Sequence, residues 1–382
     1  MNAAASNGER GSGGGPLKFL FSADGWPYIF ALAIPLAIVF EWAVHPSATV
    51  IFATAAIGLI PAAAIMGRAT EELAARSGPG IGGLLNVTFG NFPELVIAVL
   101  ALNAGLHEVV KASLVGSIIG NVLLVLGASM FVGGLGRERQ RFNATAASAQ
   151  STMLLLALAA LIMPAAYELI AGIGLPSAGA ERVDYDPTIE KISAIVAVIL
   201  LLGYGAGLLF SLVTHSALFN PVSEDHSEFA WPVRRSVAVL AGAAVVVGVM
   251  SEILVGSIEE ASQAIGLSEF FVGVFVVAIV GNAAEHWVAV LVARKDKMDL
   301  AVNIAIGSSA QIALTVAPTL VLLSFLIGPH PMPLVFNGFE LAAMIIAVLT
   351  AGQVTQDGES TWFEGFQLLA LYAVFGVVFY FA

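Results

Sequence analysis

The chain has 382 residues, of which 58% are hydrophobic and only 11% are charged, whereas soluble globular domains carry roughly 25% charged residues. This composition predicts an integral membrane protein and excludes an ordinary soluble domain. The net charge of −12 comes without a basic face, which argues against nucleic-acid binding, and the absence of cysteine excludes disulfides, thiol nucleophiles and cysteine-ligated metals.

The N-terminal residues 1–16 are polar and rich in glycine, and we expect them to form a disordered tail. They lack the basic start and apolar core of a secretory signal peptide, so the first apolar segment should remain in the protein. A helix needs about 20 mostly apolar residues to cross a bilayer. Eleven such segments follow in chain order: 26–44, 49–75, 81–103, 108–135, 143–170, 189–213, 232–258, 269–293, 300–327, 334–354 and 362–381.

These segments predict an all-α integral membrane protein with eleven transmembrane helices. Lys and Arg accumulate in the cytoplasmic loops of such proteins. Here only Lys111, Arg182 and Lys191 fall on one side, Arg68 lies within a span, and all the other basic residues fall on the opposite side. The bias predicts a multi-pass protein with a cytoplasmic N-terminus and an external C-terminus, in a bacterial inner membrane or, alternatively, a vacuolar membrane.

The longest connection between spans, residues 214–231, is acidic and also contains histidine. We interpret it as a solvated cytoplasmic linker between two halves of the chain. A regulatory cation or proton sensor is the alternative, because histidine titrates near neutral pH. The residues in question are His215, Glu224, Asp225, His226 and Glu228.

A sequence repeat relates the two halves. The pentad GNFPE at 90–94 echoes GNAAE at 281–285, and the Gly-Ser pair at 116–117 echoes that at 307–308 at the same offset of 191 residues. Five spans separate the copies, so the second copy must cross the membrane in the opposite direction. This predicts an inverted repeat of two five-helix units (spans 2–6 and 7–11), an arrangement typical of secondary transporters. The predicted parts are the tail with span one (1–47), the first repeat (48–213), the linker (214–231) and the second repeat (232–382).

Glu94 and Glu285 lie near the middle of their spans, without a nearby basic partner in the same helix or the next one to neutralise them. An intramembrane acid is costly and usually marks a transport pathway or a site. Two carboxylates that face each other can share Ca²⁺, which prefers oxygen ligands, and like charges in an apolar layer also favour proton binding. Pro93 should leave the Phe89 carbonyl free. The predicted cation- and proton-binding residues are Glu94, Glu285, Asn91, Asn282, Ser117, Ser308, Gln311, Phe89, Gly90 and Gly281, with Glu94 and Glu285 as the metal ligands.

The residues 83–95, with GSIIGN at 116–121 and LVLG at 124–127, resemble the first repeat of the calcium/proton exchangers of the cation/calcium antiporter superfamily. VGNAAEH at 280–286 and AIGSSAQIA at 305–313 are similar to the second signature of that family. The resemblance implies eleven spans, Ca²⁺ as a transported substrate rather than a cofactor, and Glu72 and Glu259 as acids of the access paths. Phe92-Pro93 departs from the small residues common in the motif, and the central linker lacks a long acidic run.

The predicted function is therefore Ca²⁺/H⁺ antiport, without enzymatic activity, and the partners are Ca²⁺, H⁺ and the lipid bilayer. The sequence does not specify an oligomeric state. The alternatives are Na⁺/Ca²⁺ or Mn²⁺/H⁺ exchange and a Ca²⁺ channel. An intramembrane hydrolase is disfavoured, because the only start of a zinc-protease motif, His107-Glu108, is followed by Lys111 where the second histidine should stand.

Overall fold

The computed structural model describes residues 25–178, 182, 184–214 and 231–382. The predicted tail and the linker histidines lie outside these residues. Within the described part the chain is helical, apart from one pair of two-residue strands, so the all-α prediction is confirmed at this level. The first span consists of η1 (Trp26–Leu32), α2 (Ala33–Val39) and η2 (Phe40–Val44).

The remaining elements fall into two runs on either side of residues 215–230. The first run contains α3 (Ala48–Gly90), α4 (Phe92–Asn103), α5 (His107–Ile119), η3 (Gly120–Val125), α6 (Leu126–Gly134), β1 (Gln140–Arg141), α7 (Ala144–Ile170), α8 (Pro187–Leu209) and η4 (Phe210–Thr214). The second run contains α10 (Val233–Ile265), α11 (Glu269–Phe271), η5 (Val272–Val277), α12 (Ala278–Arg294), α13 (Met298–Gln311), η6 (Ile312–Val316), α14 (Ala317–Leu323), α15 (Gly338–Val354), β2 (Glu359–Ser360) and α16 (Trp362–Tyr380).

Nine helical segments among the described residues are long and apolar enough to cross a membrane, and α4 and α15 are apolar but shorter. Each predicted span overlaps one of these segments, often to within a few residues. The main correction concerns the break predicted at residues 76–80, because α3 continues through it to Gly90. Gly78, Pro79 and Gly80 gave a turn signal, but the helix retains them. If straight, a helix of 43 residues would be about 65 Å long, so only part of it can lie in a hydrocarbon core of about 30 Å.

Two other helix ends differ from the predicted span ends. Helix α10 runs on to Ile265, beyond the span end predicted at residue 258. The acids Glu259 and Glu260 were read as lying near the end of the span, and both are exposed, which is compatible with a helical backbone. Helix α14 ends at Leu323, four residues before the predicted end at 327.

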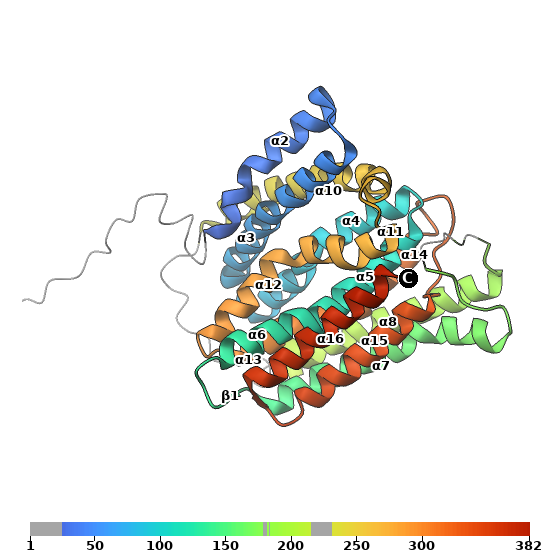
Figure 1. Ribbon diagram of the computed structural model, residues 1–382. Coiled ribbons are helices and arrows are strands. Elements are labelled where there is room, and N and C mark those ends of the chain that lie inside the picture. The colour runs from blue at the N-terminus through green and yellow to red at the C-terminus, as the bar shows by residue number, and fades with distance from the viewer. Residues whose placement is uncertain (1–24, 179–181, 183, 215–230) are drawn as a thin grey trace, which may run out of the picture.

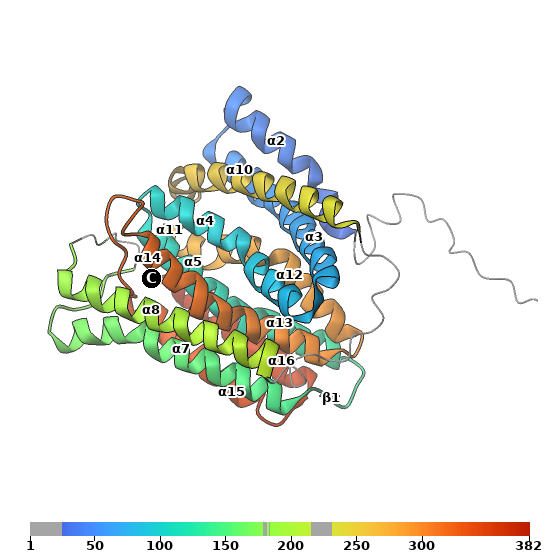
Figure 2. The same ribbon diagram turned by 180° about the vertical axis from the view of Figure 1, so that it is seen from behind.

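The helices pack in pairs that the sequence offset relates. Helices α3 and α10 lie side by side, with α2 on their outer face (Figure 1). Helix α4 packs against α10 as α12 packs against α3, and α15 packs against α5 as α7 packs against α13. Figure 2 shows α7, α8 and α15 on the side of the molecule away from α2. The π-helical segments η3 and η6 also stand at nearly the same offset.

The loops at one end of the molecule are joined to each other. Strands β1 and β2 pair antiparallel, so that Gln140 lies opposite Ser360 and Arg141 opposite Glu359. The side-chain amide of Gln140 donates to the Ala293 carbonyl at 2.9 Å. Arg139 donates to Glu359 at 2.7 Å, and this hydrogen bond holds the pKa of the Glu359 carboxyl below its ordinary value. Three loops from both halves of the chain are thereby connected.

Glycine allows one very close approach between the halves. A Cβ on Gly116 in α5 would lie 2.0 Å from the Val274 carbonyl oxygen in η5, so no larger residue fits there without movement of the backbone. Four residues later, Gly120 would meet nothing within 4 Å. Near this contact the Ser309 hydroxyl donates to the Ile118 carbonyl at 3.3 Å. Ile118 and Ser309 stand at equivalent positions of the two sequence copies, so their contact marks where the copies meet.

Candidate cation-binding site

Glu94 lies in the first turn of α4, directly after an interruption of the helix. Helix α3 ends at Gly90, and Asn91 has φ −99° and ψ 21°, outside the helical region. Pro93 stands in the first turn of α4, where no backbone N–H is needed. The expectation that Pro93 frees the Phe89 carbonyl is wrong: this carbonyl accepts the N–H of Asn91, because the interruption falls at Asn91 itself.

Glu285 occupies the equivalent place in α12, but there the helix is continuous. Gly281 and Asn282 do not interrupt it, and a π-helical segment, η5, precedes α12. Asn282 is 1% exposed, and its side-chain amide donates to the Ala278 carbonyl at 3.0 Å and to Ser117 Oγ at 3.1 Å. The two copies therefore present their glutamates from different local backbones.

The two glutamates lie close together, each against the glycine of the other motif. A Cβ on Gly90 would lie 3.1 Å from Glu285 Oε1, and a Cβ on Gly281 would lie 3.3 Å from Glu94 Cγ. The carboxylates are within electrostatic range of one another. The structure thus brings the predicted pair together, and it gives both motif glycines the same task, to make room for the opposite acid.

Several neutral side chains of the prediction surround this pair. The Asn91 amide donates to Gln311 Oε1 at 2.8 Å, and the Ser308 hydroxyl donates to Glu285 Oε2 at 3.0 Å. Ser117 accepts from Asn282, as described above. Except for the carbonyl of Phe89, the predicted set comes together from α3, α4, α5, α12 and α13.

Four buried oxygen atoms in this group receive no hydrogen bond from the described residues: both carboxylate oxygens of Glu94 and the Oδ1 atoms of Asn91 and Asn282. All four are acceptors, and buried acceptors without a partner are rare and costly in proteins. Such atoms are suited to a positively charged ligand or a proton. The amide nitrogen of each asparagine is already used as a donor, which leaves its oxygen as the free acceptor.

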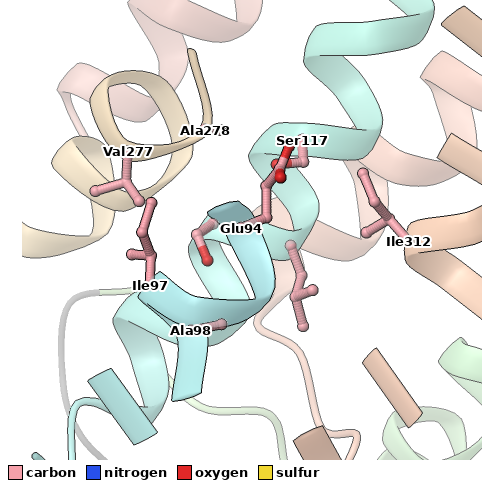
Figure 3. Close-up of a pocket in the computed structure, with 9 residues that line it drawn as sticks. Glu94, Ile97, Ala98, Ser117, Val277, Ala278 and Ile312 are labelled. Carbon is pink, nitrogen blue, oxygen red and sulfur yellow. The ribbon is translucent and has the colours of Figure 1, made fainter. Parts of the chain in front are cut away.

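A small cavity of about 10 Å³ lies beside Glu94. Figure 3 shows Glu94 and Ser117 at this cavity together with the apolar side chains of Ile97, Val277 and Ile312. This volume suits about one water-sized particle. No group of three or more His, Asp or Glu residues that could hold a metal ion occurs among the described residues, so a cation here would be held by two acids and neutral oxygens.

The structure gives the surroundings of the two acids expected along the access paths, Glu72 and Glu259, whose role there stays a prediction. Glu72 accepts the backbone N–H of Trp231 at 2.7 Å and so holds the end of the linker. Glu259 is exposed and lies within electrostatic range of Glu269. Neither lines the cavity. Glu71, which the sequence reasoning did not select, is within electrostatic range of Glu285, and nothing in the sequence distinguished it from Glu72.

A second residue pair beside the site was not predicted. His286 directly follows Glu285 in the sequence, and its Nε2 lies 3.2 Å from Asn121 Oδ1. At the sequence offset of 191 the equivalent residues are Leu95 and Ile312, which are both apolar. The difference between the copies at these two positions was the signal that could have found the pair.

Comparison with known proteins gives a consistent result. Residues 47–213 and 235–381 match the family described as sodium/calcium exchanger protein. The chain is 41% identical to a Ca²⁺/H⁺ antiporter of Aphanothece halophytica, over 92% of this chain and 95% of that protein. It is 43% identical to the Ca²⁺/H⁺ antiporter ChaA of Bacillus subtilis (strain 168), over 92% and 97%. The solved structure of native YfkE is similar with a TM-score of 0.78 and 40% identity, and the match covers 93% of this chain and 100% of that one.

Proposed function

Because the chain belongs to the sodium/calcium exchanger protein family, we propose that it is a secondary antiporter that exchanges Ca²⁺ for H⁺ across a membrane. Relatives that carry this activity in their names are 41% and 43% identical to it over almost their whole length. The family expected from the two sequence motifs is thereby confirmed. The observation that carries the proposal for the site is the set of buried, unpartnered acceptor oxygens of Glu94, Asn91 and Asn282.

Ca²⁺ binds at the Glu94–Glu285 pair in this proposal. Ca²⁺ prefers carboxylate and amide oxygens at about 2.3 to 2.6 Å, and the four unpartnered acceptors together with Glu285 offer oxygens of both kinds. Ser117, Ser308 and Gln311 orient these groups through the hydrogen bonds described above. A doubly charged ion balances two carboxylates that form no ion pair with a basic side chain of the described residues.

Protons compete with Ca²⁺ for the same two carboxylates. Without a cation, two acids close together in an apolar layer favour protonation, because neutral acids avoid both desolvation and mutual repulsion. Protonation from one side releases Ca²⁺, and loss of the protons on the other side restores the Ca²⁺-binding state. Exchange follows because the site holds either Ca²⁺ or protons, but not both at once.

The same proposal includes the arrangement in the membrane. We infer eleven spans, with 48–213 and 232–382 as inverted repeats, a cytoplasmic N-terminus and a bacterial inner membrane as the location. The repeat-related helix contacts, the similar placement of η3 and η6, and the Ile118–Ser309 contact support the repeat. The distribution of Lys and Arg supports the orientation.

The test is Ca²⁺ uptake driven by a pH gradient in proteoliposomes, with Glu94→Gln and Glu285→Gln compared with the natural protein. We expect each variant to lose at least about 100-fold in uptake, because removing one partner of a buried charged group costs about 3 kcal/mol or more. Glu138→Gln, an exposed acid of the β1 loop, serves as the control and should transport normally. Retained uptake in either central variant would remove that acid from the mechanism.

Two further arms of this experiment separate related activities. A Na⁺ gradient without a pH gradient should drive no Ca²⁺ uptake, and competition by Mn²⁺ measures the selectivity for the divalent ion. Accumulation of Ca²⁺ against its own gradient distinguishes exchange from a channel, which only equalises the two sides.

A further inference from the structure

A second group of charged residues is buried at the start of α5, away from the proposed Ca²⁺ site. Glu108 is 4% exposed, Lys111 is 1% exposed and Glu340 in α15 is 0% exposed. Glu108 stands nine residues before Ser117 in the same span, which corresponds to about 13 Å along a helix axis. Helices α5 and α15 belong to the two different halves of the chain and pack against each other, so this group lies between the halves.

The contacts within the group are well defined. The Lys111 ammonium forms an ion pair with Glu108 and donates to the Val335 carbonyl at 3.1 Å. Glu340 lies within electrostatic range of both Lys111 and Glu108. Its Oε2 accepts the Asn337 N–H at 2.8 Å in a capping box, whereas its Oε1 is buried and has no hydrogen-bond partner among the described residues.

The other titratable groups nearby do not supply the missing positive charge. Arg182 is engaged by Glu168 in α7 through two hydrogen bonds of 2.7 and 3.0 Å. Tyr185 presents its ring to both Lys111 and Arg182, with its centroid 5.9 and 4.5 Å from these cations. His107 lies near Lys111 and His330, but it is 2% exposed and its Nε2 has no hydrogen-bond partner among the described residues, which favours the neutral imidazole. His330 is exposed, so its charge is solvated.

Charge balance therefore identifies a proton site. The group contains two carboxylates and one ammonium, and Lys111 is already paired with Glu108. A second carboxylate that is fully buried and unpaired would be far more costly than a neutral acid. The unpartnered Oε1 of Glu340 is the atom that can carry a proton.

We propose that Glu340 is a second proton-binding site, which holds its proton only while the Glu108–Lys111 pair is packed against it. Separation of α5 from α15 exposes the acid to water and releases the proton, so the packing of the two halves is linked to proton uptake at this end of the molecule. Only the link to transport rests on the proposed function. The protonated state itself follows from the buried charges.

The first experiment detects the proton directly. The starting protein carries both Glu94→Gln and Glu285→Gln, so that the central carboxyls are removed. Its infrared difference spectrum should show the C=O band of a buried, protonated carboxyl at neutral pH. Glu340→Gln should remove this band. Glu364→Gln is the matched control, because Glu364 forms the other capping box of the chain, with Thr361, and should leave the band in place.

Glu108→Gln provides a sharper variant, because it leaves Glu340 intact. Glu340 is then the carboxylate that remains to pair with Lys111, so it should ionise and the band should disappear although the residue is still present. A band that survives in Glu340→Gln or in Glu108→Gln would overturn the assignment. Since these spectra need no transport, their outcome is independent of the proposed antiport.

The second experiment tests the coupling, in protein with natural central acids. Glu340→Gln mimics the protonated state and keeps the capping acceptor, so the protein should fold and still bind Ca²⁺ at the central site. The proton concentration is varied on the side of the membrane nearest Glu340. The slope of log Ca²⁺ flux against the log of this concentration should fall by up to one unit in Glu340→Gln, and Glu364→Gln should keep the natural slope. An unchanged slope in Glu340→Gln would show that the proton is only structural and would overturn the coupling.

Discussion

At the scale of single residues, the site depends on the two glycines as much as on the two acids. Gly90 and Gly281 each stand where a Cβ would press on the glutamate of the other motif, at 3.1 and 3.3 Å. Glycine also costs stability inside a helix, by about 0.5 to 1 kcal/mol relative to alanine. The close approach of the opposite acid explains why these positions nonetheless carry glycine.

We predict that Gly90→Ala and Gly281→Ala impair transport without unfolding the protein. The added methyl group requires Glu285 in the first variant and Glu94 in the second to shift by a few tenths of an ångström. Since a displacement of about 1 Å at a reacting group can cost on the order of 100-fold in rate, Ca²⁺ flux per folded protein should fall by roughly 2- to 10-fold. Gly67→Ala in α3, where a Cβ would meet nothing within 4 Å, is the control; equal flux in all three variants would contradict the role of the motif glycines.

The sequence predicted the residues of the site better than their geometry. The repeat pattern selected Glu94, Glu285 and their asparagines, and the structure brings these together. The sequence could not show that the helix is interrupted at Asn91 rather than at Pro93, because that depends on where α3 ends. Nor could the sequence separate Glu71 from Glu72. Both are acids of one helix turn, and only tertiary packing decides which of them lies within electrostatic range of Glu285 and which holds Trp231. The ligand roles themselves stay predictions.

At the scale of elements, apolar length was a reliable guide and turn signals were not. Nearly all the predicted spans correspond to separate helices, because a bilayer demands long apolar segments whatever their packing. Gly78-Pro79-Gly80 indicates a turn in soluble proteins, whereas α3 passes through it. The π-helical segments η3 and η6 carry no recognisable residue pattern and could not have been predicted.

The contact between α5 and η5 leads to a prediction about stability. Gly116→Ala places a methyl group against the Val274 carbonyl, where backbone rather than a flexible side chain must move. Overpacking of this kind typically costs about 1 to 3 kcal/mol. The apparent melting temperature in detergent should therefore fall, measured by loss of monodisperse protein on heating.

Gly120→Ala, one turn further along the same span, is the matched control because a Cβ there meets nothing within 4 Å. Since alanine is the better helix former, this variant should be at least as stable as the natural protein. Equal melting temperatures for the two variants would show that α5 and η5 can separate without cost.

At the scale of the whole molecule, the orientation in the membrane is the main prediction still to be tested. The chain contains no cysteine, so a single introduced cysteine can be labelled without background. Lys295→Cys lies in the turn between α12 and α13, and Ala171→Cys lies after α7, both at exposed positions. We expect a membrane-impermeant maleimide added to intact cells to label position 171 but not 295, and the reverse in inside-out vesicles. Labelling of both from one side would refute the proposed topology.

The divergence of His286 and Asn121 from Leu95 and Ile312 has a consequence for how the two halves of the chain can vary. The contact between Asn121 of the first copy and His286 of the second is polar, whereas the residues at the repeat-related positions, Leu95 and Ile312, are both apolar. Gly90 with Glu285, and Gly281 with Glu94, impose a stricter constraint on the sequence, because each acid lies against the glycine of the opposite half. In the proposed inverted repeat, a change at one of these four positions therefore requires a matching change in the other half. A chimera that joins one half of this chain to the other half of a distant homologue will work only if these glycines and glutamates still fit together.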